Sequence, residues 1–407
     1  MNNIILSLII IIETINLTPS ISIETSVKFA ILILTALLIF YKIRKKLTIV
    51  KIFTSIFLFF VVIVFYRLLG ISTCAWGNLY NQISFFLNIP FLLFIIENTN
   101  LRQQKFLFSY LFILIFWLII DNIQIYSRYG FILHSIDVGD LVGTNYGGTT
   151  FNTCCMLFYS ACLFVFLNEE KKRIRILVGI GGFSALYYIY FCGARGTVVL
   201  LSFIVTVLLL VLNNRRESRK VLHTSLFLLL LILFLIVLSD NILDFLISIS
   251  PERLAYRFSD IKNTTENGLT ADSFSGRYGL YWVSIDSFFR GVDTILFGIG
   301  DRRGSISGLI SYNEAGIGGH SEILDHCARY GILGIVLVSV IFRELYVYLS
   351  GQLWFRKNKY SIYGIIMSFI ICAFVKVIFM PDIGCTIFII IPLSIMIINS
   401  KNEKIWL

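Results

Sequence analysis

Charged residues are scarce in this sequence. Asp, Glu, Lys and Arg make up 14% of the 407 residues, while hydrophobic residues make up 57%. Soluble domains carry about 25% charged residues, because their surfaces face water. This composition and the mean hydropathy of +0.85 therefore exclude a soluble protein. We expect most of the apolar surface to face lipid in a polytopic membrane protein.

Motifs for nucleotide and disulfide chemistry are also missing. The chain has no P-loop and no Gly-rich dinucleotide fingerprint, so cytoplasmic chemistry driven by ATP or nucleotide sugars has no support. It has no CxxC pair, and its eight cysteines lie mostly in apolar segments, so no disulfide scaffold is implied. The N-terminus lacks the basic region and cleavage site of a signal peptide, and we interpret it as a retained membrane segment.

The basic residues gather in short segments between apolar runs, and the formal net charge is +10. These segments are 42–46, 102–105, 171–175, 215–220, 356–359, and Lys401 with Lys404. Placing both termini in the cytoplasm puts all of them on the cytoplasmic side, as the positive-inside rule requires. The basicity thus predicts orientation in the cytoplasmic (inner) membrane and not nucleic-acid binding.

Apolar runs near the ~20 residues that cross a bilayer predict about twelve transmembrane helices. They are 3–17, 25–41, 48–66, 79–97, 106–121, 150–167, 176–192, 197–213, 222–238, 331–350, 361–380 and 384–399. The fold class is therefore all-α. The predicted organisation is nine helices in 1–238, a large outward-facing helical loop at 239–330, and three helices with a cytoplasmic C-terminus in 331–407.

Two helices are expected inside the large loop. Tyr278, Trp282, Ile285 and Phe289 recur at helical spacing and predict an apolar stripe that lies on the membrane surface or against the bundle. A second, short helix is predicted from about Ser321 to Tyr330, with acidic residues in its first turn and Gly331 leading into the next membrane helix. His320 precedes the start of this short helix, after two glycines.

Three residues are the main candidates for chemistry. Arg195 lies in a GARG break between apolar segments, where a charge costs about 2.5–3.5 kcal/mol on insertion scales. A guanidinium there could bind phosphate, or it could extend to the interface or pair with a loop carboxylate. Arg277 begins the apolar stripe and is either a second phosphate ligand or a solvated arginine. His320 is either a general base for a hydroxyl nucleophile or a loop histidine without a role.

Other polar residues could complete the pocket. Arg67 and Lys376 fall near the outer ends of their helices, although extension to the interface explains them as well. The remaining candidates for substrate binding are Glu322, Asp325, Tyr278 and Trp282. We also considered a metal site formed by His320, Glu322, Asp325 and His326, but its spacing matches no known ligand pattern, so no metal is expected.

These features, in this order, resemble the O-antigen polymerase and O-antigen ligase superfamily. The residues that carry the resemblance are CGARG (192–196), SGR (275–277) before an aromatic helix, LFGIGD (296–301) and GGHSEILDHCARYGILG (318–334). The last segment is the most specific. The similarity spans about residues 176–350, and the first 150 residues match only in hydropathy.

The resemblance implies a membrane-embedded, GT-C-like glycosyltransferase that needs neither metal nor nucleotide nor any other cofactor. Its donor and acceptor would be oligosaccharides linked to undecaprenyl diphosphate, and a chain-length regulator would be a candidate partner. Arg195 and Arg277 would bind the diphosphate, and His320 would face the acceptor hydroxyl.

The chain departs from the family at the histidine. Many members have Asn after it, where this chain has Ser321, and ligases tend to have HxHN, which is absent here. The pattern therefore favours a polymerase that builds O-antigen or capsular polysaccharide over a ligase that transfers glycan to lipid A-core. A flippase for lipid-linked oligosaccharides is the other alternative, but a loop of this size on one face is typical of an enzyme.

Overall fold

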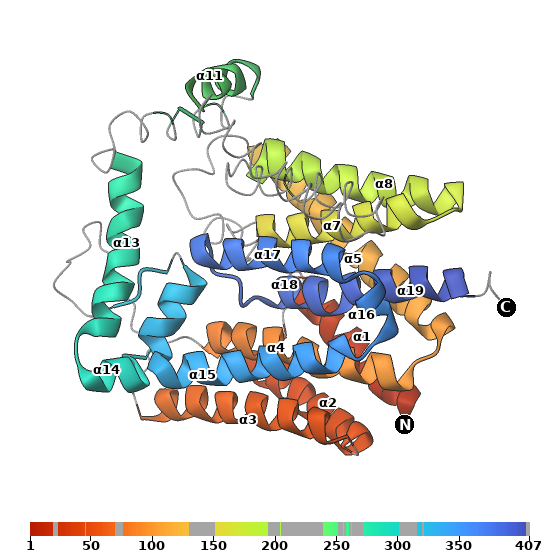
Figure 1. Ribbon diagram of the computed structural model, residues 1–407, viewed down its shortest axis with the longest axis horizontal. Helices are drawn as coiled ribbons and strands as arrows, with labels where there is room; N and C mark the ends of the chain where they lie inside the picture. The colour runs from red at the N-terminus through yellow and green to blue at the C-terminus, as the bar shows by residue number, and fades with distance from the viewer. Residues whose placement is uncertain are drawn as a thin grey trace. The chain divides into compact units, whose positions relative to one another are not determined.

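A computed structural model describes residues 1–18, 23–44, 46–69, 76–129, 151–193, 239–250, 272–300, 316–319 and 321–403, with isolated positions at 204, 255, 258, 259 and 262. Every regular element in this part of the chain is a helix (Figure 1). The all-α class predicted from the sequence is therefore confirmed. The described chain forms two compact units.

Unit 1 comprises Met1–Ile115, Arg277–Lys357 and Ile370–Leu407. Its elements are α1 (Asn2–Leu17), α2 (Thr25–Ile43), α3 (Leu47–Leu68), α4 (Trp76–Asn98), the first half of α5 (Leu101–Tyr129), most of α13 (Asp272–Phe289), α14 (Val292–Phe297), α15 (Glu322–Ser350), α16 (Leu353–Lys357), the end of α17 (Lys359–Val375), α18 (Pro381–Cys385), the π-helix η4 (Thr386–Ile390) and α19 (Ile391–Glu403). Helix α4 forms its core, because 89% of its most apolar window is buried. Helices α2, α3 and α18 pack against it, and α15 packs against α3.

Unit 2 comprises Phe116–Gly276 and Asn358–Phe369. Its described elements are the second half of α5, α7 (Phe151–Asn168), α8 (Lys172–Tyr187), the π-helix η2 (Tyr188–Gly193), α11 (Ser239–Ile249) and the first part of α17. Helices α7 and α8 pack along each other, and the buried ring of Tyr188 contacts that of Phe151 at 5.1 Å. Arg195 follows η2 and lies outside the described residues.

Eight helices in the described part of the chain are long and apolar enough to cross a membrane. They are Thr25–Ile43, Leu47–Leu68, Trp76–Asn98, Leu101–Ile125, Phe151–Asn168, Lys172–Cys192, Glu322–Ser350 and Pro381–Ser400. Each matches a predicted span within a few residues at most ends. Helices α1 and α17 match two more but are shorter, and 197–213 and 222–238 lie outside the described residues. The chain is thus a multi-pass membrane protein, and the count of twelve spans stays a prediction.

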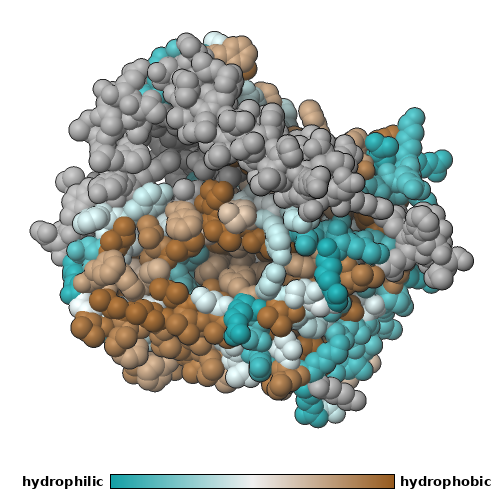
Figure 2. All heavy atoms as spheres, viewed as in Figure 1, coloured by the Kyte–Doolittle hydropathy of each residue, from teal (hydrophilic) through white to brown (hydrophobic). Residues whose placement is uncertain are grey.

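Unit 1 carries apolar side chains on its outside, as expected for a surface in contact with lipid. On α3, Phe57 is 64% exposed and Leu68 is 74% exposed. The face of the molecule over α3 is correspondingly brown at the lower left of Figure 2. Because exposed phenylalanine and leucine on one helix face would associate in water, this surface is suited to a bilayer.

The predicted break between the short loop helix and the next membrane helix is present. Ser321 is the N-cap of α15, and its Oγ accepts a hydrogen bond from the Leu324 N–H at 3.3 Å. The helix then continues to Ser350, but Gly331 within it has φ 61° and ψ −157°. Only glycine adopts such a conformation easily, so Gly331 separates the two parts of α15.

The predicted loop helix is also present, as α13. The sequence left open whether its apolar stripe lies on the membrane surface or against the helix bundle. Trp282 is 50% exposed and Phe289 is 66% exposed, whereas Ser284 and Ser287 are fully buried. Trp282 and Phe289 therefore point away from the rest of unit 1, and small polar residues face inward. Of the two environments predicted for the stripe, this arrangement favours the membrane surface.

Candidate functional site

Glu322 ties the first turn of α15 to the chain that precedes α18. Its Oε1 accepts a hydrogen bond from Arg329 Nη1 at 3.1 Å. Its Oε2 accepts from the backbone N–H groups of Ile378 at 3.0 Å and Phe379 at 3.2 Å. The Glu322 N–H donates to the carbonyl oxygen of Lys376 at 3.0 Å. Both oxygens of this buried carboxylate thus bind protein groups.

The Glu322–Arg329 pair is buried, since Glu322 is 1% exposed and Arg329 is 7% exposed. Residues seven apart lie two turns along the same face of a helix, which lets the two side chains meet. Removing one partner of a buried ion pair is costly, because the other charge remains away from water. In this structure Glu322 therefore holds the start of α15 in place, and its role in glycan binding stays a prediction.

Two serines fasten α13 to the loop that leads into α15. Ser284 Oγ donates to Asp325 Oδ1 at 2.6 Å and accepts from the Gly318 N–H at 3.0 Å. Ser287 Oγ donates to the Gly316 carbonyl oxygen at 2.8 Å and accepts from the Gly316 N–H at 2.9 Å. Because the serines are three residues apart, they lie on one face of the helix. We call this set of contacts, together with Glu322, the α13–α15 junction.

Gly318 lets the loop approach α13 closely. A Cβ atom at this position would lie 2.0 Å from the Leu280 carbonyl oxygen, where no side chain fits. The close approach to α13 therefore requires glycine at position 318, the first residue of the GGHSE sequence.

The turn at 296–300 docks on the break in α15. The N–H of Ile299 donates to the Ala328 carbonyl oxygen at 2.8 Å, and the N–H of Gly300 donates to the Arg329 carbonyl oxygen at 3.0 Å. The conformation of Gly331 interrupts the helical hydrogen bonds that these two carbonyls would otherwise accept. Backbone N–H groups of the LFGIG sequence therefore pair with backbone carbonyls of the ARYG sequence.

His326 lies in an aromatic cluster on the same helix. Its ring is 5.1 Å from that of Tyr330, 5.6 Å from Phe59 and 5.7 Å from Phe379. It is buried, so in this structure His326 packs among these rings. Among the residues that the structure describes, no group of three His, Cys, Asp or Glu side chains is arranged to hold a metal ion.

The three main candidates are only partly described. Arg195 and His320 lie outside the described residues, although Gly319 and Ser321, on either side of His320, are within them. Arg277 and Tyr278 belong to α13, and only their backbone is described. Arg277 is seven residues before Ser284 and so lies two helical turns from the contact with Asp325. The roles of Arg195, Arg277 and His320 stay predictions.

Arg67, Lys376 and Trp282 occupy different positions around this region of unit 1. Arg67 is in the last turn of α3, with its guanidinium carbon 5.6 Å from the centre of the Trp76 ring. Lys376 is half-buried and contributes its carbonyl oxygen to the junction. Trp282 points outward from α13. Nearby, the Tyr66 hydroxyl donates to the Phe297 carbonyl oxygen, which joins the end of α3 to α14.

Sequence reasoning missed the residues that assemble the junction, namely Ser284, Ser287 and Arg329. Serines at helical spacing beside a row of aromatic residues were a usable signal, because polar residues on a membrane-surface helix need a polar partner. The spacing of Glu322 and Arg329 was a second signal. No sequence signal identified the distant residues to which these side chains bond.

The sequence of this chain matches no protein-family model and no curated protein. The resemblance to the O-antigen polymerase and ligase superfamily therefore stays a prediction from the sequence motifs.

Proposed function

We propose that this chain polymerises oligosaccharide repeat units carried on undecaprenyl diphosphate into O-antigen or capsular polysaccharide. One observation carries the proposal. Ser284 and Asp325 are 41 residues apart in the sequence, and a hydrogen bond of 2.6 Å joins them. This contact fastens the helix that contains Arg277 to the segment that contains His320. The helix that follows the SGR motif and the segment that follows the GGH motif thus belong to one packed junction.

The proposed reaction exchanges one bond to the anomeric carbon for another. An acceptor sugar hydroxyl attacks the anomeric carbon of the donor chain and forms a glycosidic bond. The bond from that carbon to the diphosphate oxygen breaks, and undecaprenyl diphosphate leaves with the bonding electrons. His320 takes the hydroxyl proton as general base. Because the donor already carries a good leaving group, no nucleotide is consumed.

Arg195 and Arg277 bind the diphosphate in this proposal. Negative charge grows on the leaving group as the glycosyl bond breaks, and a guanidinium positioned beforehand stabilises it in a site of low dielectric constant. The planar fork of arginine also matches two phosphate oxygens at once. Lysine at these positions would restore activity only in part, because a point charge lacks that geometry.

The proposed site faces the outer side of the cytoplasmic membrane, with both termini in the cytoplasm. This orientation rests on the distribution of Lys and Arg between the segments that flank the membrane helices. Reporter fusions at Asn267 and Lys404 test it. The proposal requires that they lie on opposite sides.

The surface glycan of a strain that lacks the gene tests the function. A polymerase mutant loses the long-chain ladder but keeps a single repeat unit attached to its acceptor. A strain that loses every attached repeat would point to the ligase alternative. An unchanged ladder would contradict both.

A further inference from the structure

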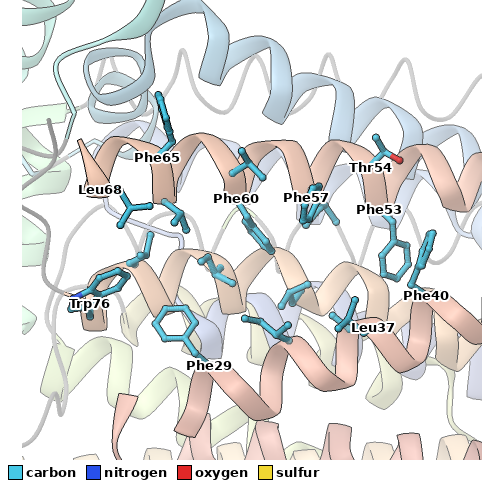
Figure 3. A pocket seen from close by; sticks show the side chains of 18 residues that line it. Phe29, Leu37, Phe40, Phe53, Thr54, Phe57, Phe60, Phe65, Leu68 and Trp76 are labelled. Atoms are coloured by element: carbon cyan, nitrogen blue, oxygen red, sulfur yellow. The ribbon is translucent and has the colours of Figure 1, made fainter. Parts of the chain in front are cut away.

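Helix α4 presents two different rows of side chains to its neighbours in unit 1. Its apolar row, Leu79, Ile83 and Leu87, lines a groove of about 780 Å³ along α2 and α3. Figure 3 shows the side chains of α2 and α3 that point into this groove. Because Leu37 and Phe57 in the groove are 60% and 64% exposed, it opens to the surroundings of the protein and belongs to the surface suited to lipid.

The polar row of α4, Tyr80, Ser84 and Asn88, follows one residue further along and faces α1 and α18. The Tyr80 hydroxyl donates to Asn16 Oδ1 at 2.6 Å, and Asn16 Nδ2 donates to Ser84 Oγ at 2.9 Å. Asn88 Nδ2 lies 2.8 Å from the position that a Cβ atom of Gly384 would occupy. These side chains form a polar band inside unit 1, where a membrane protein keeps such groups away from lipid.

Glu13 on α1 is the carboxyl group of this polar band. It is three residues before Asn16, so the two side chains lie on one face of α1. Glu13 is 0% exposed, and neither of its carboxylate oxygens accepts a hydrogen bond of ordinary geometry. Within the described part of the chain it forms no ion pair. The thiol of Cys385, the last residue of α18, interacts with the carboxyl group, but a thiol is a weak donor.

Glu322 shows how unit 1 accommodates a buried carboxylate when other groups of the protein pair with it. Its two oxygens accept three hydrogen bonds, one of them from Arg329. Glu13 is as deeply buried and has none of these partners. An isolated carboxylate is so unfavourable away from water that such a group takes up a proton instead.

We propose that Glu13 is a proton-binding site within the membrane helices of unit 1. The buried polar atoms of the band that lack a partner are all acceptors, namely both oxygens of Glu13 and the amide oxygen of Asn88. A proton on Glu13 supplies the missing donor and cancels the charge, so that α1 can pack against α4 and α18. The inference does not depend on the proposed function, and the proposed reaction does not use Glu13.

The surroundings of Glu13 favour a proton over a metal cation. Hard cations take several oxygen ligands, whereas this carboxyl group meets a thiol, and a proton needs no coordination shell. The titratable groups that face it are Tyr80 of α4 and Cys385 of α18, both uncharged at neutral pH. From α2, the Lys28 ammonium nitrogen lies 5.9 Å from the centre of the Tyr80 ring, and from α5, Tyr110 bonds the residue after Glu13. The π-helix η4 begins directly after Cys385, and π-helices are frequent at functional sites.

Labelling of purified full-length protein with dicyclohexylcarbodiimide tests the proton. The carboxyl proton moves to a nitrogen of this lipid-soluble reagent and the carboxylate oxygen bonds its central carbon, so only a protonated group forms the adduct. We expect mass spectrometry to find the adduct on Glu13 and not on Glu322, which is buried but paired. Above the pH at which Glu13 loses its proton, each further pH unit should lower labelling by about tenfold, as for a single titrating group. Equal labelling of the two residues, or labelling of Glu13 that ignores pH, would overturn the proposal.

Infrared spectra detect the same proton without a reagent, and so they also apply to a carboxyl group that the reagent does not reach. The carbonyl band of a protonated carboxyl group should be present at neutral pH and should be lost in Glu13→Gln, which keeps the shape of the side chain. Glu24→Gln, at an exposed position before α2, should leave this band unchanged. A Glu13→Gln spectrum that loses only carboxylate bands would show that Glu13 is ionised.

A change of salt at constant pH tests a metal cation. Dicyclohexylcarbodiimide should label Glu13 equally in sodium chloride and in choline chloride. Protection by Na⁺ and not by choline would show that a metal ion occupies the site, and it would reject the proton.

Thermal unfolding in detergent, without Na⁺, provides the matched comparison. Glu13→Gln should leave the midpoint at neutral pH unchanged, because an amide is as neutral as a protonated carboxyl group. Glu322→Gln should lower the midpoint, because Arg329 loses a charged partner. Equal losses would show that the fold requires a charge on Glu13. Since none of these readouts needs polymer to be made, labelled Glu13 in a protein without polymerase activity retains this inference and rejects the proposed function.

Discussion

The α13–α15 junction and the groove along α2 and α3 belong to the same unit, but they differ in how their surfaces are satisfied. In the junction, both oxygens of Glu322 and the hydroxyl of Ser284 bind other groups of the protein. In the groove, apolar side chains such as Leu37 and Phe57 remain exposed. A region whose groups bind one another is suited to positioning. A region that leaves apolar side chains uncovered is suited to contact with lipid.

This comparison predicts that substitutions in the junction destabilise the protein and that substitutions in the groove do not. The largest loss is expected for Glu322→Ala, which leaves Arg329 without this carboxylate and two backbone N–H groups without an acceptor. The expected cost is about 3–5 kcal/mol, as for other broken buried pairs. Thermal unfolding of the purified protein in detergent measures it.

The control for Glu322→Ala is Asp286→Ala, which removes one partner of Arg290. Their side chains are 46% and 40% exposed, at a distance of 3.3 Å. Exposed pairs contribute about 0–1 kcal/mol, so the midpoint should barely move. Similar losses from the two substitutions would contradict the structural role of Glu322.

Gly298→Ala should have the next largest effect. Gly298 has φ 74°, and a Cβ atom there would lie 2.4 Å from the backbone of Arg329. A positive φ of this kind costs alanine about 1–3 kcal/mol, and the overlap adds about 1–3 kcal/mol. Gly319 has nearly the same φ, 72°, but no atom of the described residues lies within 4 Å of its Cβ position. Gly319→Ala should therefore show only the first cost, and equal losses in thermal stability would rule out the close docking of the 296–300 turn.

Ser284→Ala should cost about 1–3 kcal/mol, because a buried carboxylate oxygen of Asp325 and the Gly318 N–H lose their partner. Ser350→Ala provides the comparison, since its hydroxyl bonds the Val347 carbonyl oxygen at an exposed site. Amide hydrogen exchange should also rise in α13 for the first variant alone. Unchanged exchange there would mean that Ser284 does not hold the helix.

The smallest effects are expected in the groove. Leu37→Trp in the groove and Leu34→Trp outside it should each change the free energy of unfolding by no more than about 0.5 kcal/mol, as surface substitutions usually do. Thermal unfolding in detergent again provides the measurement. A large loss for Leu37→Trp alone would show that the groove is closed by packing and is not open to lipid.

The helices were predictable from sequence because the apolar runs and the glycine breaks are local signals. Ser321 and Gly331 mark the start of α15 and the break within it in the sequence, and the structure has both. The contact between Ser284 and Asp325 was not predictable, since it joins two helices that are distant along the chain. The inward face of α13 was ambiguous for a different reason. At a membrane surface the apolar side chains can face lipid, and small polar ones such as Ser287 then face the protein.

The groove left even less trace in the sequence. Its lining residues come from three helices that are all apolar, and hydropathy alone does not distinguish a wall of the groove from any other surface in contact with lipid. Leu37 and Leu34 have the same side chain and similar exposure, yet only Leu37 lines it. Lys28 and Arg67 lie over aromatic rings of α4 only because α2, α3 and α4 pack together, and the sequence does not show that packing.

The most direct test of the proposed function is a reaction with purified protein and a purified lipid-linked repeat unit, without nucleotide. We expect products that grow by whole repeat units, with release of undecaprenyl diphosphate. His320→Ala should lower turnover by about 10²–10⁴-fold, the usual contribution of a positioned base, while the protein remains folded. A wild-type protein that forms no longer product, or a His320→Ala variant with the full rate, would contradict the proposed mechanism.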